Sequence, residues 1–528
     1  MKVACYVHPI VHTAGPCFNG DWNETLAKIL RSLQDDARCE CLLITGRWFT
    51  SPTGVPTVRL DELLLYRRLR AVCELPTALV NENYQDEAEN HPALDVIAAQ
   101  VADQLEQVED QLKGFVPDII IGFGGDANCL AKLWPKALRL HVDCGPYSRR
   151  PFPKSFFFDH LGMHAKSIVG RAGRHLLANP VSPDGKALVG AFRSVMAAEL
   201  TTNDPFRDHA FRGQFRHLCL LPLQVSQQFS FDGQVPYRSQ FEFLHDFLCA
   251  APPDVGVIIT EHPHAAPVLK RTGPYTNIEY LRQKFPNMIF LDEFRLCSTS
   301  SQFLVPKVDG VWSVSSSVGY QALLFGRALG SPTKAPLASV ADAATFDAFF
   351  DRLVHNDGYR ADGLIAWQLE RYLVPETFLN DGRWLCDYFG RRLDATRPVA
   401  DPIDAFVPIG EPELLKNAWA VRKPKAAPYL WPVDELNPLD SMRAELLALV
   451  RERDSLLGST SWRMTAPFRA VTVALRTWSA QIKRFHEKLL RKMRLALRDY
   501  SPNDRLARGG LRPPNRERGN AVGSNSRN

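Results

Sequence analysis

Apolar residues recur along the first two hundred positions in two alternating patterns. Short runs rich in Val, Ile and Leu are typical of buried strands, and apolar positions three and four residues apart are typical of helices. Parallel strands covered by helices on both faces have this appearance. The pattern therefore predicts a first parallel sheet followed by a Pro- and Phe-rich loop. The expected strands are 3–7, 41–45, 117–122 and 137–142, the expected helices are 23–33 and 92–112, and the expected loop is 146–158.

The same alternation begins again at residue 217. Strand, loop and helix repeated in this order predict a second parallel sheet, wound by right-handed crossovers. Two such Rossmann-like units facing a cleft form the GT-B arrangement of glycosyltransferases, although other two-lobed α/β enzymes share the pattern. The expected strands are 217–224, 255–260, 288–291 and 308–314, and the expected helices are 241–249, 280–285 and 319–326.

The chain has 528 residues, which is too many for a single core, so two domains and an extension are expected. Eight prolines between 397 and 438 indicate a linker or a wrapping segment. The end of the chain is rich in Arg, Asn and Gly, which is typical of disorder. The expected divisions are 1–205 for an acceptor-side domain, 206–395 for a nucleotide-sugar donor domain, 396–438 for the linker, 439–500 for a helical basic tail and 501–528 for a disordered end.

Positive charge is concentrated in the basic tail. Between 461 and 500 there are ten Lys and Arg residues against Glu487 and Asp499, with Trp, Phe and Leu interleaved. Cations and apolar side chains at helical spacing suit an anionic membrane surface. The tail is therefore expected to contact the cytoplasmic face of the inner membrane or an assembly partner. A solvated helix or a coiled-coil face is the alternative.

Composition places the rest of the chain among ordinary globular proteins. Hydrophobic residues make up 45% and charged residues 23%, and the net charge of +5 is too small to indicate nucleic-acid binding. No signal peptide and no apolar run long enough to span a bilayer is evident. Eleven cysteines without a CxxC pair favour reduced thiols and a cytoplasmic location. Cys39 and Cys41 lack a second ligand pair at zinc spacing, so no metal site is expected.

The sharpest chemical signal follows the strand at 308–314. Ser315, Ser316 and Ser317 precede a helix expected to begin at Gly319. Free backbone N–H groups and the positive end of the helix dipole favour a phosphate at such a place, and the hydroxyls add donors. The alternative is that one serine simply caps the helix. Three consecutive serines exceed what one cap requires, so phosphate binding is favoured.

Two further strand ends in the second unit carry polar residues. Glu261 and His262 follow the strand at 255–260, at the edge where ligands bind in open α/β sheets. Gln224 begins a polar loop, 224–232, that is rich in groups able to bind a sugar and ends at Asp232. Taken alone, the His262 loop is better interpreted as a solvated loop without a binding role, and the Gln224 loop is equally an ordinary polar loop. The serine segment one strand–helix unit later favours phosphate binding by His262, and Gln224 is expected to bind substrate.

The first unit offers an acid and two cations. Asp143 ends a strand, and Arg149 and Arg150 follow in the next loop, where they are placed to meet an anionic donor or acceptor. Asp159 is more typical of a cap for the next turn than of catalysis. The glycine-rich stretch 122–128 lacks the Lys-Ser/Thr of a phosphate loop, so it is interpreted as a turn lining the acceptor side.

Together these segments resemble the bacterial capsule-polysaccharide synthesis family, whose best-understood members are β-Kdo transferases using CMP-Kdo. The resemblance implies a GT-B fold, a CMP-sugar donor and transfer onto a capsule or lipopolysaccharide glycan. His-Pro and the serine run also look like the phosphate-binding motifs of bacterial sialyltransferases, so His262 and Ser315–Ser317 would hold the donor phosphate. The matching pieces are Pro-Leu-Gln-Val at 222–225, His-Pro at 262–263, Ser-Ser-Val-Gly-Tyr-Gln-Ala-Leu at 316–323, and Asp-Cys-Gly-Pro-Tyr-Ser-Arg at 143–149 with Phe-Phe-Asp at 157–159.

Two positions depart from the family pattern. Where the family usually carries an Asp after Leu-Gln-Val, the chain has Gln227 and Gln228, and the next acid is Asp232. At the position of Gln321 the family commonly carries a Glu, which is suited to binding a ribose. Glutamine is neither nucleophile nor base, so Asp143 or Asp232 takes that role, the donor differs, or activity is lost. The rival function is therefore an inactive GT-B scaffold that recruits other transferases, and a UDP-sugar epimerase is a weaker third option.

The tail carries a separate resemblance. Ser459–Arg469 looks like a segment appended to many bacterial surface-glycan glycosyltransferases and methyltransferases. The combined prediction is a nucleotide-sugar-dependent glycosyltransferase, with a CMP-sugar preferred and no cofactor besides that donor. No metal is required if His262, the serine hydroxyls and the helix dipole stabilise the leaving phosphate.

Overall fold

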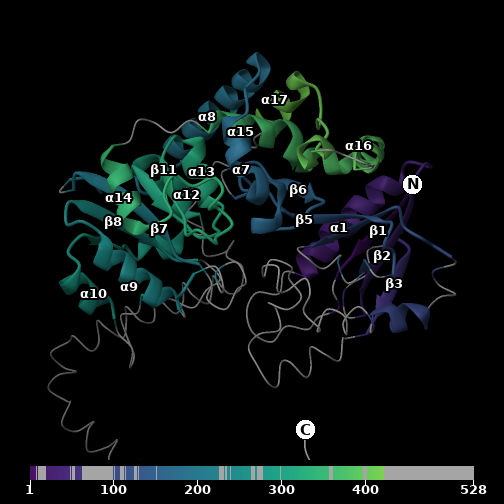
Figure 1. Cartoon of the computed structure of the whole chain (residues 1–528), viewed down its shortest axis with the longest axis horizontal. Helices are drawn as coiled ribbons and strands as arrows, with labels where there is room; N and C mark the ends of the chain where they lie inside the picture. Colours follow the sequence, from purple (N-terminus) through teal and green to yellow (C-terminus); the bar gives the residue numbers. More distant parts are fainter. Residues whose placement is uncertain are drawn as a thin grey trace, which may run out of the picture. The chain divides into compact units, whose positions relative to one another are not determined.

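The computed structural model describes most of residues 1–420. Outside the description lie 10–18, 50–53, 62–98, 108–111, 124–127, 150–151, 225–230, 232–234, 263–267, 270–276, 356–360, 397–400, a few single positions and everything after residue 420. Two α/β sheets occupy the described residues, and helices pack against both (Figure 1).

The first sheet has seven strands in the order β12-β6-β5-β4-β1-β2-β3. Strands β1 to β5 are parallel, whereas β6 is antiparallel to β5 and β12 is antiparallel to β6. Read from β3, the order 3-2-1-4-5-6 is that of a Rossmann sheet. The strands are Lys2–Tyr6 (β1), Glu40–Gly46 (β2), Thr57–Leu60 (β3), Ile119–Phe123 (β4), Leu138–Cys144 (β5), Ser155–Asp159 (β6) and Leu373–Pro375 (β12).

The second sheet has five parallel strands in the order β11-β10-β7-β8-β9, again a Rossmann order. All six residues of β8 are buried, because helices cover both faces of the sheet. The strands are His217–Pro222 (β7), Val255–Thr260 (β8), Met288–Ile289 (β9), Gly310–Trp312 (β10) and Ala328–Gly330 (β11). The expected fold class, two Rossmann-like parallel sheets as in GT-B proteins, is confirmed.

Local sequence explains where many helices begin. Five of the longer ones start on a Ser, Thr or Asp whose side chain accepts a backbone N–H of the first turn, which satisfies a donor that the helix itself leaves free. The α-helices are Asn19–Gln34 (α1), Ile168–Ala178 (α7), Pro183–Thr202 (α8), Gln240–Ala250 (α9), Ile278–Lys284 (α10), Glu293–Leu296 (α11), Ser300–Leu304 (α12), Val318–Leu324 (α13), Phe346–Val354 (α14), Asp362–Trp367 (α15), Gly382–Ala395 (α16) and Pro412–Ala420 (α17).

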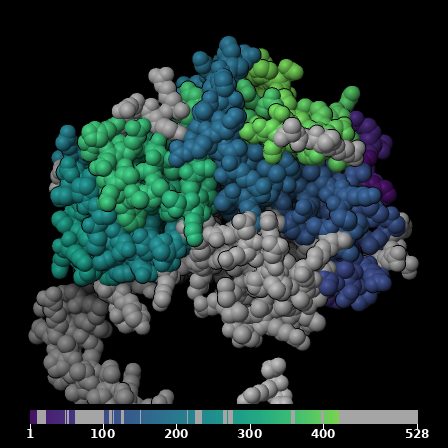
Figure 2. Space-filling view, in the orientation of Figure 1, coloured from purple at the N-terminus to yellow at the C-terminus, as the bar shows by residue number. Residues whose placement is uncertain are grey.

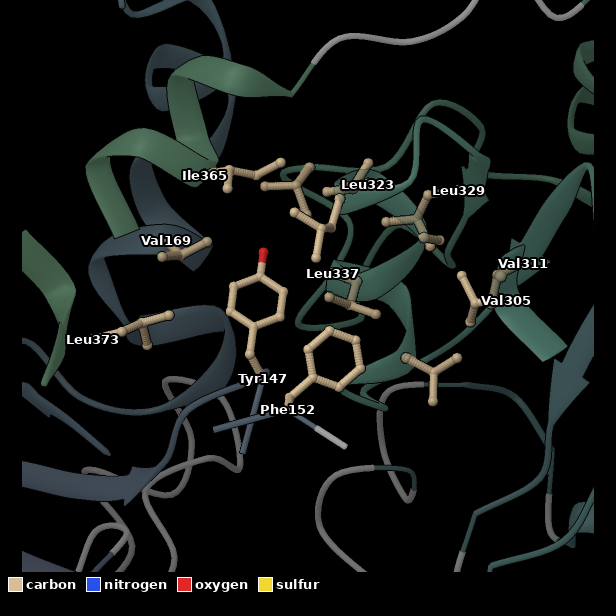
Figure 3. Packing of buried hydrophobic residues seen from close by; sticks show 14 of the residues in the cluster. Tyr147, Phe152, Val169, Val305, Val311, Leu323, Leu329, Leu337, Ile365 and Leu373 are labelled. Carbon is tan, nitrogen blue, oxygen red and sulfur yellow. The ribbon is translucent and has the colours of Figure 1, made fainter. Parts of the chain in front are cut away.

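Buried apolar residues form one continuous cluster that includes residues of both sheets. Tyr147 and Phe152, from the loop after β5, lie beside Leu323 of α13 and Leu337 (Figure 3). A second cluster lies on the other face of the first sheet and includes Ala4. The two sheets thus share a packed core.

The chain returns to the first sheet after the second sheet is complete. β12 pairs with β6, and α16 packs against α1. In the space-filling view the light green of this returning segment adjoins the purple N-terminal residues (Figure 2). β12 and α16, both within the expected donor domain 206–395, thus contact elements of the first domain, and the domain boundaries stay a prediction. In the predicted linker, α17 packs on α8.

Other expectations need smaller corrections. The loop expected at 146–158 ends in β6, because its Phe-rich end pairs with β5. The helix expected at 319–326 is α13, Val318–Leu324. Within the expected helix 92–112, residues 101–106 are described and are helical. The Ser459–Arg469 segment, the predicted tail and the disordered end lie outside the described residues. In the described part of the chain, no helix combines the length and apolarity needed to cross a membrane.

Candidate functional site

The second sheet has its topological switch point between β7 and β10. In an open α/β sheet, ligands bind in the crevice outside the carboxyl ends of the strands at such a point. The register pairs Pro222 of β7 with Thr260 of β8. Continuing both chains by two residues brings Gln224 and His262 to the same sheet edge. The segment after β10 supplies the predicted serines there.

Gln224 and Ser315 are in direct contact across the switch point. The Gln224 Nε2 donates to Ser315 Oγ at 2.7 Å, and the Ser315 backbone N–H donates to Gln224 Oε1 at 3.2 Å. The Gln224 backbone N–H donates to Gln240 Oε1, which orients the loop from α9. Both Gln224 and Ser315 remain partly exposed. The serine segment predicted to bind the donor phosphate and the Gln224 segment predicted to bind substrate therefore lie in direct contact.

The other two serines are held differently. The Ser316 backbone N–H donates to Ser313 Oγ at 3.1 Å, and Ser316 Oγ accepts the Val318 N–H at 3.4 Å. Ser317 occupies the N-cap position of α13, but its side chain makes no capping hydrogen bond. Helix α13 has only seven residues, so its dipole contributes less than the sequence suggested. Because the Ser315 and Ser316 N–H groups already donate within the site, the serine hydroxyls are the principal groups of this segment available to an anion.

Glu261 has internal partners for both carboxylate oxygens. Its Oε1 accepts the Val268 and Leu269 N–H groups, each at 2.7 Å, and its Oε2 accepts Arg295 Nε at 2.6 Å. The side chains are 6% exposed for Glu261 and 15% for Arg295. This geometry gives Glu261 a role in shaping the loop after β8. Direct contact with a nucleotide stays a prediction.

We expect Glu261→Ala to destabilise the fold by about 3 kcal/mol, because it removes the carboxylate paired with Arg295 and leaves the Val268 and Leu269 N–H groups without this acceptor. Glu261→Gln keeps one acceptor oxygen and should cost less. Urea unfolding of the two variants measures the difference. Equal stability of Glu261→Ala and the unchanged chain would show that the ion pair is not structural.

Thr260 ends the neighbouring strand β8, and His262 follows it. His262 is partly buried two residues beyond β8. Thr260 Oγ1 shares a hydrogen bond of 2.7 Å with Ser301 Oγ, which anchors the strand end to α12. This anchor places His262 at the predicted edge, and its contact with a phosphate stays a prediction.

Gln321 joins the two sheets. It is fully buried, and its Nε2 donates to the Pro146 carbonyl at 3.1 Å, while its Oε1 has no partner among the described residues. Pro146 lies three residues after Asp143, so this bond ties the loop after β5 to the helix after the serines. Gly319 is packed so closely that a Cβ there would come within 2.5 Å of Leu337. In this structure both residues position α13, and their contact with a donor stays a prediction.

Asp143 lies at the end of β5 and is partly buried. Its Oδ1 accepts the Cys144 N–H at 2.6 Å. Burial raises the pKa of Asp143 to about 6, partly opposed by the Cys144 hydrogen bond and the Arg149 charge. A carboxyl that titrates near neutral pH is suited to general acid–base chemistry. Arg149 is exposed. Arg150, predicted to bind substrate, and Asp232, the alternative catalytic acid, lie outside the described residues.

Asp159 acts as a cap, as the sequence favoured. It is fully buried and accepts the N–H groups of Leu161 and of Ile168, the first residue of α7, each at 2.8 Å. Tyr372, in the returning segment, also donates its hydroxyl to Asp159 at 3.2 Å. Sequence reasoning did not identify Ser313 or Gln240 as supports of the site. Ser313 belonged to the same serine-rich run, whereas nothing local distinguished Gln240.

One cavity of about 850 Å³ lies away from the switch point. It is lined by residues of α16, the segment 408–414, Met1 and Arg38. In the described part of the chain, no group of three or more His, Cys, Asp or Glu side chains is arranged to hold a metal ion.

Two Rossmann-like sheets place the described residues in the α/β class with the GT-B architecture. No protein-family model matches the chain, and no curated protein matches its sequence. Among solved structures it is similar to Thermosulfurimonas dismutans KpsC, a β-Kdo 2,7 transferase, at 17% identity over 54% of this chain and 84% of that one, with a TM-score of 0.35.

Two other solved structures contain UDP or UDP-GlcNAc. The S. aureus MnaA–UDP co-structure shares 11% identity over 74% of this chain and 97% of that one, with a TM-score of 0.29. The Neisseria meningitidis UDP-GlcNAc 2-epimerase shares 12% identity over 73% and 99%, also with a TM-score of 0.29. Similarity at this level is too distant to assign a function.

Proposed function

We propose that the chain is a nucleotide-sugar-dependent glycosyltransferase acting on a capsule or lipopolysaccharide glycan. The observation that carries the proposal is the contact between Gln224 and Ser315 at the switch point of the second sheet. This contact presents hydroxyl and amide donors at the edge where α/β sheets bind ligands. A CMP-sugar such as CMP-Kdo is the preferred donor, on the sequence resemblance already described.

In this proposal the serine segment and His262 bind the donor phosphate. Fixed donors aimed at the departing phosphate stabilise the charge that develops on it, which is usually a large contribution to catalysis. Asp143, with its pKa raised to about 6, removes the proton of the acceptor hydroxyl as general base. Arg149 orients an acidic sugar, with Arg150 in the same role. Asp232 is the alternative acid.

The remaining parts of the proposal concern location and partners. The enzyme works in the cytoplasm on a glycan or glycolipid acceptor, and its basic tail contacts the inner membrane or assembly partners. Membrane binding would follow from several Lys and Arg residues, each contributing about 1 kcal/mol near an anionic surface.

Thermal unfolding with CMP, UDP and GDP tests the donor site. A nucleotide at about 100 times its Kd should stabilise the folded chain by about 2.7 kcal/mol, and we expect this shift with CMP. Ser317→Ala should leave the Tm without ligand unchanged, because the hydroxyl caps nothing. It should weaken CMP binding about tenfold, the effect of losing one hydrogen bond to a charged group.

Thr201→Ala is the matched control. It removes an exposed hydroxyl on α8 that donates to Ala197 O, so it should leave CMP binding unchanged. A shift with UDP or GDP in place of CMP would keep the transferase and replace the donor. No shift with any of the three nucleotides would contradict the proposed donor site.

An inactive scaffold is the second candidate, favoured by the position of Gln321. Its amide is fully buried and donates to the Pro146 carbonyl. In this position it presents no accessible group to a ribose, and it lacks the carboxylate that a Glu would supply. A scaffold would bind CMP without turnover. Release of CMP from CMP-Kdo, with and without glycan acceptor, separates the two functions.

A further inference from the structure

Two thiols from distant parts of the chain are in contact beside the first sheet. Cys39 Sγ lies 2.8 Å from Cys386 Sγ, although the residues are 347 positions apart. Cys39 immediately precedes Glu40, the first residue of β2, and is partly exposed. Cys386 lies in α16 and is buried. The contact joins the N-terminal sheet to the helix that returns to it.

Neighbouring residues hold the two thiols in this arrangement. Arg38 NH1 donates to Asp387 Oδ1 at 2.7 Å, so an ion pair spans the residues adjacent to both cysteines. The same guanidinium is paired with Asp36, which fixes the turn before β2. Helix α16 also packs along α1. The sulfur atoms are therefore brought together by the folded chain, so forming a bond between them requires little rearrangement.

A small reagent can reach this position. Cys386 lines the cavity of about 850 Å³, together with Met1, Arg38 and Trp384. Burial raises the pKa of Cys39 above the ordinary range, and the Cys386 contact raises it further. The two sulfur atoms, 2.8 Å apart, are already close enough for a bond to form between them without movement of the backbone. The cavity and the raised pKa of Cys39 are consistent with a reduced pair that reacts only when an oxidant is present.

We propose that Cys39 and Cys386 form an oxidation site, in which a small-molecule disulfide converts the two thiols into an intramolecular disulfide that staples α16 to the start of β2. The thiolate of one cysteine attacks the reagent, forming a mixed disulfide and releasing one reagent thiol. The second cysteine loses its proton and attacks the protein sulfur of that mixed disulfide, releasing the other reagent thiol. The protein loses two electrons and two protons, and the reagent is reduced to two thiols.

The staple would act on stability. A cross-link over 347 positions restricts the unfolded chain strongly. The disulfide would also hold α16, which follows the second sheet in the chain, against the first sheet. In a reducing compartment the pair stays as thiols, and the ion pair and helix packing alone hold α16.

Oxidised glutathione and the full chain provide the test. After oxidation, free thiols are blocked with N-ethylmaleimide, and the chain is cleaved with trypsin without reduction. We expect a disulfide-linked pair of the peptides 39–47 and 384–391, bounded by Arg38, Arg47, Arg383 and Arg391. The oxidised chain should have a Tm about 5 °C above that of the reduced chain.

Three variants identify the bond, because the first peptide also contains Cys41, a buried thiol near Cys386. Cys41→Ser should retain both the linked peptides and the Tm shift, whereas Cys39→Ser and Cys386→Ser should each lose them. Exposed Cys249 is the internal control and should be blocked by N-ethylmaleimide or carry glutathione, with no link to another peptide. The proposal is overturned if the oxidised chain yields no linked peptides, or yields them only from cross-linked dimers. It is also overturned if the linked peptides persist in Cys39→Ser or disappear in Cys41→Ser.

Discussion

Asp143→Asn should lower sugar transfer by about 10²–10⁴-fold while making the folded chain more stable above pH 6. The loss of activity follows from removing the proposed general base. The gain in stability has a separate cause. Burial raises the pKa of Asp143 from 3.8 to about 6, so ionising this carboxyl in the folded chain is unfavourable. Asparagine keeps an acceptor oxygen for the Cys144 N–H without carrying a charge.

The pH dependence has a definite sign. Below about pH 4 the carboxyl is protonated in both the folded and the unfolded chain, so it costs nothing. Between about pH 4 and pH 6 the folded chain keeps a proton that the unfolded chain has released, so stability falls as the pH rises. Above pH 6 the full cost applies, on the order of 2–3 kcal/mol. The Asp143→Asn variant should not show this decrease in stability between pH 4 and pH 6.

Urea unfolding from pH 4 to pH 8 measures the effect, and transfer from CMP-Kdo measures the activity. Asp143→Glu is a useful companion, because it keeps a carboxyl but moves it by one methylene. If Asp143→Asn transfers sugar at the normal rate, the catalytic assignment passes to Asp232. If the pH profile of unfolding is unchanged, Asp143 is not buried in the way described here.

Arg392→Met should destabilise the fold by about 3–5 kcal/mol, the cost of removing a buried, hydrogen-bonded charge that stabilises the nearby Asp159 carboxylate. Arg392 is fully buried in α16, where NH1 donates to Phe158 O at 2.9 Å and to the Tyr388 hydroxyl at 3.1 Å. The guanidinium also lies 4.4 Å from the centre of the Phe406 ring. Its removal leaves the Phe158 carbonyl without this donor and takes a favourable charge from near Asp159, whose pKa burial already raises.

Arg391→Met is the matched control on the same helix. Arg391 is exposed and donates to Pro408 O at 3.0 Å, so its loss should change stability by less than about 1 kcal/mol. Urea unfolding of both variants gives the comparison. Equal effects at the two positions would contradict a structural role for the buried guanidinium.

Local pattern was sufficient for most of the elements around the site. The apolar run 255–260 coincides with β8, because a strand buried on both faces must be apolar along its whole length. β5 and β7 lie within two residues of expectation for the same reason. Ser315–Ser317 were identifiable because polar residues directly after a buried strand mark the carboxyl edge of a sheet.

Short and irregular elements were not predictable in this way. β6 follows a Pro-rich stretch that resembles a loop, and β12 has only three residues. Neither strand is long enough to show a recognisable alternation of apolar and polar residues. Both become strands because an edge of the first sheet is available to pair with them.

Contacts between distant segments were decided only by the tertiary structure. Gln224 meets Ser315 because the strand order places β7 beside β10, and Gln321 meets Pro146 because α13 packs against the loop after β5. Cys39 meets Cys386 because the chain returns to its first sheet. Periodicity along a sequence reports which face of an element is buried, so the sequence by itself determined the two sheets and their polar strand ends. Which of those ends meet depends on strand order and crossovers, which no local pattern encodes.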